Sequence, residues 1–171
     1  MEVQDQGHDP GLQIVVTTED KPTDSNAAVG QKLLLLASFA KELQTQSHLI
    51  HFNYCAPNFL AVHNFLKAQY ETHTVQFDQL GEYVRILNYY MPMCSVGLKD
   101  ALGPCFKHCD CYEPTGMLTT YHDNLGTFEK TIKMVEPAAQ AAEHYDVANY
   151  LGELLGETCK ASWMIRATLQ H

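Results

Sequence analysis

Four side chains in one stretch of the sequence have the chemistry to bind a divalent metal ion. They are two histidines and two carboxylates, His51, His63, Asp78 and Glu82. Between the histidines, Pro57 ends one helix and Asn58 is a favourable N-cap for the next. An antiparallel hairpin about this break would bring the two imidazoles face to face. Asp78 and Glu82 are four residues apart, so their carboxylates share one helix face.

Two imidazoles and two carboxylates suit an iron or zinc ion, but a single chain cannot bring all four to one ion. Fifteen residues separate His63 from Asp78, which is about 22 Å along a straight helix. A metal–ligand bond is only about 2 Å long. Two copies packed antiparallel about a two-fold axis would remove the conflict, because each histidine pair would meet the carboxylates of the other copy. The sequence therefore predicts two identical sites formed by dimerisation.

Three segments follow a family pattern: HLIHF (48–52), APNFLAVHNFLKAQY (56–70) and FDQLGEYVRIL (77–87). With the closing KASWMIRATL (160–169), they resemble the Dps proteins, the dodecameric miniferritins named for DNA protection in starved cells. The resemblance covers most of residues 30–170. It implies an all-α, ferritin-like four-helix bundle and an iron-oxidising centre between subunits. The ligands that it implies are His51, His63, Asp78 and Glu82.

The sequence departs from the family pattern at three positions. Phe52 stands where the family has a tryptophan, which removes a redox-active indole. Lys67 stands at an acidic position, which puts binding of a second metal ion in question. The usual Glu-Arg pair is Glu82-Tyr83, with Arg85 two residues further on. The four ligands themselves are retained.

Length and composition favour one globular domain. The chain has 171 residues, 46% of them hydrophobic and 18% charged, which is ordinary for a folded domain with a sizeable core. No apolar run approaches the ~18 residues of a membrane span, and the first ten residues lack the features of a secretory signal. We therefore expect a cytoplasmic protein. Six cysteines in that compartment favour free thiols or metal ligands over a disulfide framework.

Residues 1–29 are expected to form an acidic, flexible N-terminal tail that precedes a ferritin-like domain at 30–171. The tail has a single basic residue, Lys21, against six carboxylates. The formal net charge of the chain is −9, which repels a phosphate backbone. Because relatives of the Dps family bind DNA through lysine-rich tails, this mode of DNA binding is not expected here.

Hydrophobic periodicity predicts four long helices and one short one. Their expected bounds are 28–55, 58–89, 96–102, 115–142 and 146–169. The short helix, 96–102, falls in the crossover between the second and third long helices. A hairpin, a long connection and a second hairpin are typical of ferritin-like bundles. Met91-Pro92 is expected to end the second helix, and Pro137 to weaken the third near its end.

Other residues near the four ligands have candidate roles. His48 lies one turn before His51 and could add a ligand or a supporting hydrogen bond. Lys67 could pair with a carboxylate of the site, or extend to solvent. His73 is off the face of Asp78 and is expected at the surface. Two aromatic residues are expected in the core rather than as electron relays, Trp163 and Tyr70.

Two further groups could bind metal ions. The crossover sequence CFKHCDC contains Cys105, His108, Cys109 and Cys111, which could bind zinc or could be buried apolar thiols. On the last helix, Asp146, Glu153 and Glu157 fall on one narrow stripe. The stripe could be a solvated face. The resemblance instead implies that Asp146 and a glutamate such as Glu153 line a pore that admits iron.

The leading functional hypothesis is a ferroxidase that oxidises Fe(II) with hydrogen peroxide or dioxygen at its inter-subunit centres. The ferric product would be stored as mineral in a hollow shell, and this would protect against oxidative damage. The resemblance implies that the shell is a dodecamer built from two-fold dimers. Zinc could compete for the same ligands. Two alternatives are a DNA-binding nucleoid protein and a zinc-occupied scaffold without turnover.

Overall fold

The computed structural model describes residues 24–170, and every element within that range is helical. The elements are α1 (Asp24–Asn53), α2 (Phe59–Ile86), α3 (Ser95–Leu102), η1 (Gly103–Cys105), α4 (Pro114–Ala141) and α5 (Tyr145–Leu169). Four long helices with a short helix in the crossover confirm the predicted all-α, ferritin-like bundle. Most of the expected N-terminal tail lies outside the described residues.

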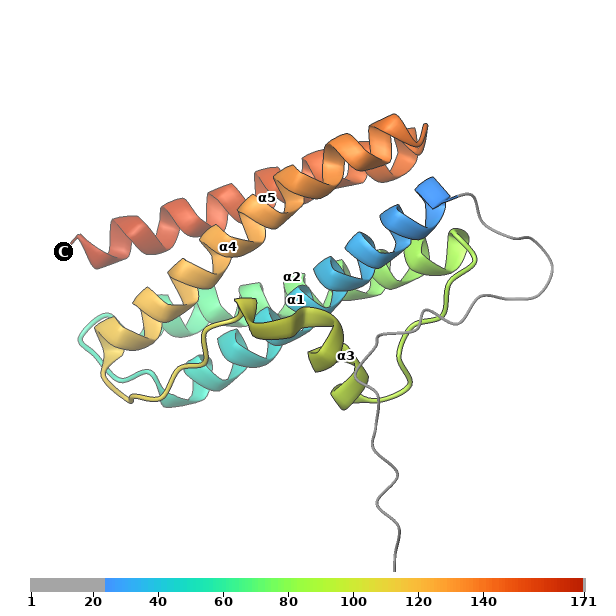
Figure 1. Ribbon diagram of the computed structural model, residues 1–171. Coiled ribbons are helices and arrows are strands. Elements are labelled where there is room, and N and C mark those ends of the chain that lie inside the picture. Colours follow the sequence, from blue (N-terminus) through green and yellow to red (C-terminus); the bar gives the residue numbers. More distant parts are fainter. Residues whose placement is uncertain (1–23, 171) are drawn as a thin grey trace, which may run out of the picture.

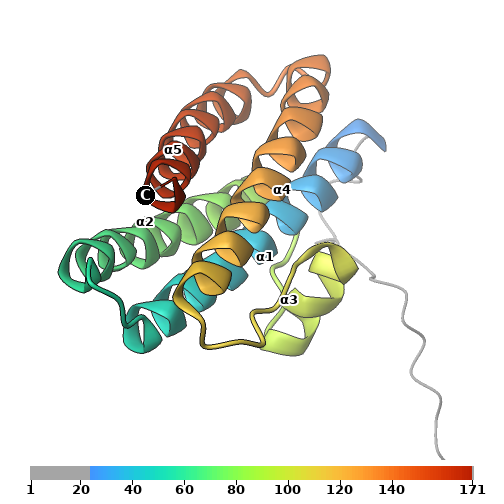
Figure 2. The ribbon, with the colours of Figure 1, turned by 90° about the vertical axis from the view of Figure 1, so that its left-hand side faces the viewer.

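The bundle consists of two helical hairpins, α1 with α2 and α4 with α5 (Figure 1). The crossover between the hairpins carries α3, which packs against α1 (Figure 2). The core is built where the helices α1, α2, α4 and α5 present their apolar faces to one another, with Phe39, Leu66, Leu80, Phe128 and Leu151 among its fully buried side chains. The end of α5 lies beside the α1–α2 turn, the turn that sets the two histidines opposite each other.

The α1–α2 turn forms where the Pro57-Asn58 sequence predicts it, but Asn58 does not cap α2 with its side chain. The Asn58 Oδ1 atom instead accepts a hydrogen bond of 2.8 Å from the hydroxyl of Tyr54. Tyr54 is buried, and its amide donates to the Ile50 carbonyl at 2.8 Å. The Asn58 side chain therefore stabilises the turn and does not cap the helix.

Helix α2 ends earlier than predicted, in a Schellman motif ahead of Met91-Pro92. Asn88 adopts a φ of 71°, and the Tyr89 amide donates back to the Val84 carbonyl at 3.1 Å. Asparagine is one of the few non-glycine residues that tolerate this conformation. The ring of Tyr89 is then buried against Gly30 of α1, where a Cβ atom would lie only 2.7 Å from Tyr89 Cδ2.

Helix α1 begins at Asp24, so residues 24–29 are helical and not part of a flexible tail. Val29 is buried in the core, and His144 Nε2 lies 2.9 Å from the Asn26 Oδ1 atom. These tertiary contacts stabilise the first turns of α1. The acidic, proline-containing sequence that precedes α1 does not predict a helix start at this position.

Helix α4 begins at a strong cap. The carboxylate of Glu113 accepts hydrogen bonds from the Thr115 and Gly116 amides, at 3.0 and 2.5 Å, and Pro114 occupies the first helical position. These hydrogen bonds hold the pKa of Glu113 below its ordinary value. At the other end, α4 continues for four residues beyond Pro137, so this proline does not end the helix.

Candidate metal centre

His51 and His63 meet across the α1–α2 hairpin, as their spacing predicts. The two rings stack with centroids 3.7 Å apart and an interplanar angle of 21°. The hydrogen bonds of the pair are reciprocal: His51 Nδ1 lies 2.9 Å from the His63 carbonyl oxygen, and His63 Nδ1 lies 3.1 Å from the His51 carbonyl oxygen. Each ring is thus oriented by the backbone of the other helix.

This arrangement fixes the tautomer of both rings. A carbonyl oxygen only accepts, so each Nδ1 atom must carry the proton and donate it. The lone pair of each neutral ring is then on Nε2, which makes no hydrogen bond within the described part of the chain. A Nδ1–H···O=C bond that orients a ring and frees Nε2 is the usual support of a metal-binding histidine.

Aromatic rings surround the histidine pair. Tyr70 packs edge-on against the His51 ring at 5.4 Å, and stacks on His48 at 4.0 Å. His48 also stacks on Phe52, at 4.7 Å. The centroid of the His48 ring is 6.0 Å from that of His51. His48 therefore lies between two rings beside the pair.

The two carboxylates lie apart from the histidines, on the second half of α2. Asp78 and Glu82 are exposed and line an open groove of about 590 Å³ together with Ile86 and Met91. Because α2 is one uninterrupted helix, the pairs are separated by about 22 Å. Within residues 24–170 no group of three or more His, Cys, Asp or Glu side chains is placed to hold a metal ion. A single chain therefore brings the two histidines together and the two carboxylates together, but it does not bring all four side chains to one place.

Lys67 does not reach Asp78 or Glu82. Its ammonium group pairs with Glu71, one turn further along α2, and this hydrogen bond raises the pKa of Lys67 above its ordinary value. The pair is solvent-exposed, so it contributes little to stability. It nevertheless keeps a positive charge one helical turn beyond His63.

Two sequence-based expectations about single residues were wrong. His73 is not at the surface: only 2% of it is exposed, and it forms hydrogen bonds to Gln76 and Tyr121. A signal was present, since His73 lies seven residues from both Leu66 and Leu80, which are fully buried on the same face. Trp163 is 56% exposed and not part of the core.

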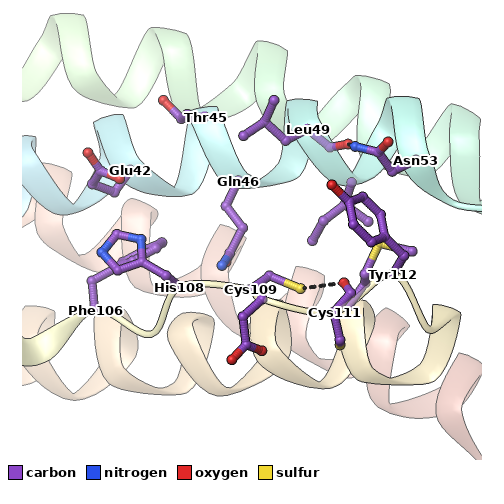
Figure 3. Close-up of a pocket in the computed structure, with 13 residues that line it drawn as sticks. Glu42, Thr45, Gln46, Leu49, Asn53, Phe106, His108, Cys109, Cys111 and Tyr112 are labelled. Carbon is purple, nitrogen blue, oxygen red and sulfur yellow. Dashed lines mark hydrogen bonds between the residues drawn. The ribbon is translucent and has the colours of Figure 1, made fainter.

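The cysteines of the crossover do not converge. All are free thiols. Cys105 donates to the Leu102 carbonyl at 3.1 Å, whereas Cys109 donates to the Cys111 carbonyl at 3.4 Å (Figure 3). His108, Cys109 and Cys111 line a cavity of about 330 Å³ between the crossover and α1 (Figure 3). Cys105 is not among the lining residues.

The acidic stripe of α5 is exposed and faces the end of α2. Its members are Asp146, Glu153 and Glu157. Burial raises the pKa of Tyr83 on α2, and the carboxylates of Asp146 and Glu153 raise it further. Tyr83 packs against Tyr150 at 5.4 Å. Glu157 differs from the others because it accepts a hydrogen bond of 2.8 Å from Gln76.

Comparisons with known proteins identify the family to which this fold belongs. The model of the ferritin-like domain family matches residues 35–171, most of the chain. The protein therefore belongs to the ferritin-like family. No curated protein sequence matches the chain. None of the described helices is long and apolar enough to cross a membrane.

Among ferritin-like proteins, solved structures of Dps proteins share this fold, which confirms the predicted resemblance. A Dps protein from Bacillus brevis superposes with a TM-score of 0.81 at 18% identity, covering 87% of this chain and 99% of the other. Antigen TpF1 from Treponema pallidum gives 0.80 at 19% identity, covering 91% and 100%. A Dps protein from Vibrio cholerae O1, a member of a broad superfamily of ferritin-like diiron-carboxylate proteins, gives 0.80 at 15% identity, covering 92% and 98%.

Proposed function

We propose that the protein is an iron-oxidising and iron-storing miniferritin. Its substrate, Fe(II), binds between two copies of the chain: His51 and His63 belong to one copy, Asp78 and Glu82 to the other. The observation that carries the proposal is the reciprocal hydrogen bonding of the stacked histidines, which leaves the Nε2 lone pairs of both rings free. A histidine pair with only a structural role has no need to leave the Nε2 atoms of both rings unbonded.

The donor set suits this reaction. Neutral imidazoles bind Fe(II), while anionic carboxylates favour the harder Fe(III) product. The acceptor is hydrogen peroxide or dioxygen; with peroxide, two Fe(II) ions, one H₂O₂ and two protons give two Fe(III) ions and two water molecules. Zinc fits the same ligands but has no redox chemistry, so it acts as a competitor.

The two-fold arrangement follows from the separation of the pairs along α2. The groove that contains Asp78 and Glu82 is open and bordered by Ile86, a large apolar side chain that is 65% exposed. A second copy that covers this groove would bury Ile86 and bring its own histidines to the carboxylates. We further propose that the dimers assemble into a dodecameric shell in the cytoplasm, which stores the ferric product and limits oxidative damage.

The net charge of −9 favours this function over DNA compaction. An acidic surface attracts Fe(II) cations and repels the phosphate backbone of DNA. Within the shell, Asp146 and Glu153 of α5 are proposed to line a pore through which iron enters.

The decisive experiment mixes metal-free protein with Fe(II) and hydrogen peroxide and follows ferric absorbance. Glu82→Gln should slow the initial rate by at least about 10-fold, the loss that even an outer partner of a metal ligand causes. Glu136→Gln, at a half-buried position of α4 outside the proposed ligand set, is the matched control and should retain the parental rate. Sedimentation should show that both variants assemble normally, because glutamine keeps the size of the side chain. Parental rates in both Glu82→Gln and His63→Ala would falsify the proposed centre. If the parental protein binds zinc but does not catalyse Fe(II) oxidation, the zinc-occupied scaffold is favoured instead.

A further inference from the structure

A chain of polar side chains crosses the otherwise apolar interior between α2, α4 and α5. Tyr121 is fully buried, and its hydroxyl lies 2.7 Å from His73 Nε2. His73 Nδ1 lies 2.7 Å from Gln76 Oε1. Gln76 Nε2 donates to Glu157 Oε2 at 2.8 Å, and Glu157 is at the surface. The network is fully hydrogen-bonded, which is the condition under which buried polar groups persist.

The hydrogen bonds determine where each proton lies. Because the Gln76 amide nitrogen donates to a carboxylate, the Gln76 oxygen is the acceptor that faces His73. His73 Nδ1 must then carry the proton, so Nε2 presents its lone pair to the Tyr121 hydroxyl. Burial lowers the pKa of His73 to about 4, which keeps this imidazole neutral near pH 7. Burial also raises the pKa of Tyr121, so the phenol keeps its proton.

A buried phenol hydrogen-bonded to a neutral imidazole is suited to losing an electron. A phenol that loses an electron becomes a strong acid, so oxidation is easy only where a base is already in place to take the proton. The His73 lone pair, 2.7 Å away, is such a base. Tyr89 provides the contrast within the same chain: it is equally buried, but its hydroxyl has no partner in the described structure.

Tyr121 also touches both helices that carry the histidine pair. The Tyr121 hydroxyl lies near the Ser47 hydroxyl of α1, which donates its own proton to the Leu43 carbonyl at 2.7 Å. It also lies 3.5 Å from Gln69 Oε1 of α2. Ser47 is one helical turn before His51, a rise of about 6 Å. Gln69 is six residues after His63, a rise of about 9 Å. The phenol is therefore within about two helical turns of the proposed iron centre.

We propose that Tyr121 and His73 form a redox pair that supplies the second electron for peroxide reduction when the centre holds a single Fe(II). This inference rests on the proposed function. A single ion is expected because Lys67 stands at an acidic position of the family pattern, and its ammonium group, paired with Glu71, has no lone pair to bind a second cation. One Fe(II) supplies only one of the two electrons that hydrogen peroxide takes up on conversion to water.

In the proposed reaction, Fe(II) and Tyr121 are two one-electron donors that together reduce one molecule of hydrogen peroxide. Fe(II) and Tyr121 each give one electron, and H₂O₂ takes both electrons with two protons from solvent to form two water molecules. The phenolic O–H bond of Tyr121 breaks, and its proton moves to His73 Nε2. The products are Fe(III), a neutral tyrosyl radical and an imidazolium, whose Nδ1–H remains bonded to Gln76. A second Fe(II) ion then returns one electron to the radical, which recovers its proton from His73.

The first test is electron paramagnetic resonance of samples frozen after one Fe(II) per chain and hydrogen peroxide are mixed. A neutral tyrosyl radical is expected in the parental protein and in Tyr89→Phe, and should be absent in Tyr121→Phe. His73→Gln keeps a hydrogen-bond acceptor for the phenol but no base, so it should also lose the signal. Retention of the parental signal in Tyr121→Phe would overturn the assignment to this residue.

A second test needs no iron. A photogenerated ruthenium(III) polypyridyl complex is used as a one-electron oxidant of the metal-free protein, and tyrosyl absorbance is followed in time. Oxidation of Tyr121 should be about 100-fold slower in His73→Gln, the range that a positioned base contributes. His63→Ala should not change it. Sedimentation of each variant establishes that the protein is folded and assembled.

The two tests separate this inference from the proposed function. If iron is oxidised but neither test gives a Tyr121 radical, the redox pair is overturned and the proposed function stands. If the photochemical radical forms at Tyr121 but iron is not oxidised, the proposed function fails. The electron-donor role then fails with it, while the redox pair itself is retained.

Discussion

The chemistry of individual residues in this protein depends on which ring nitrogen each histidine leaves free. At His51 and His63, backbone carbonyls accept hydrogen bonds from Nδ1 and leave Nε2 free for the proposed metal ion. At His73, the Gln76 oxygen accepts a hydrogen bond from Nδ1 and leaves Nε2 to accept one from the Tyr121 phenol. In both places the neighbour of one nitrogen determines the function of the other. The same side-chain type thus serves two proposed roles.

The burial of His73 predicts an acid-sensitive stability. Its pKa falls from 6.5 to about 4 on folding, so between these pH values the unfolded chain binds a proton that the folded chain does not. The free energy of unfolding should therefore fall as the pH drops from 6.5 to 4, by about 3 kcal/mol from this residue. His73→Gln has no such titration. Urea unfolding at a series of pH values should give a shallower decline in this variant, and equal declines would contradict the assignment.

At the scale of elements, the ends of α2 and α4 are set by residues with positive φ that are not glycine. Asn88 has a φ of 71° and Glu143 a φ of 61°. In each case the next amide bonds back into the last turn, from Tyr89 to Val84 and from His144 to Ala139. Tyr89 and His144 then contact α1. The helix ends therefore fix how α1 sits in the bundle.

The contact between Gly30 and Tyr89 gives a prediction about α1. A Cβ atom at Gly30 would lie 2.7 Å from the buried Tyr89 ring, so Gly30→Ala should lower the free energy of unfolding by about 1–3 kcal/mol. The matched control is Gly126→Ala in α4, where a Cβ atom meets nothing within 4 Å. That change should raise stability by about 0.5–1 kcal/mol because alanine favours the helix. Both variants are measured by urea unfolding at one protein concentration. An unchanged free energy of unfolding in Gly30→Ala would show that the Tyr89 ring moves to accommodate the added methyl group.

At the scale of the whole molecule, the proposed site exists only in the assembly. The straight α2 helix holds the histidine pair and the carboxylate pair apart within one chain. A two-fold dimer makes two equivalent sites, each with histidines from one copy and carboxylates from the other. A variant in either pair therefore inactivates both sites of a homodimer.

Mixing two inactive variants tests this geometry directly. A dimer of one His63→Ala chain and one Glu82→Gln chain has one site with both changes and one site with neither. Random re-pairing after joint refolding should therefore restore about a quarter of the parental number of active sites. Fe(II) oxidation by the mixture is compared with that of each variant refolded alone. If the centre lay within one chain, no activity would return.

The sequence by itself determined the helices, the hairpin and the distance between the two ligand pairs, because these depend on local properties: apolar periodicity, proline breaks and helical rise. It also carried the family resemblance, which the fold confirms. Only the tertiary structure decided the helix end at Asn88 and the exposure of Trp163. The physical reason is that the residues packed against each helix face depend on how the two hairpins come together, and no local sequence pattern specifies that packing.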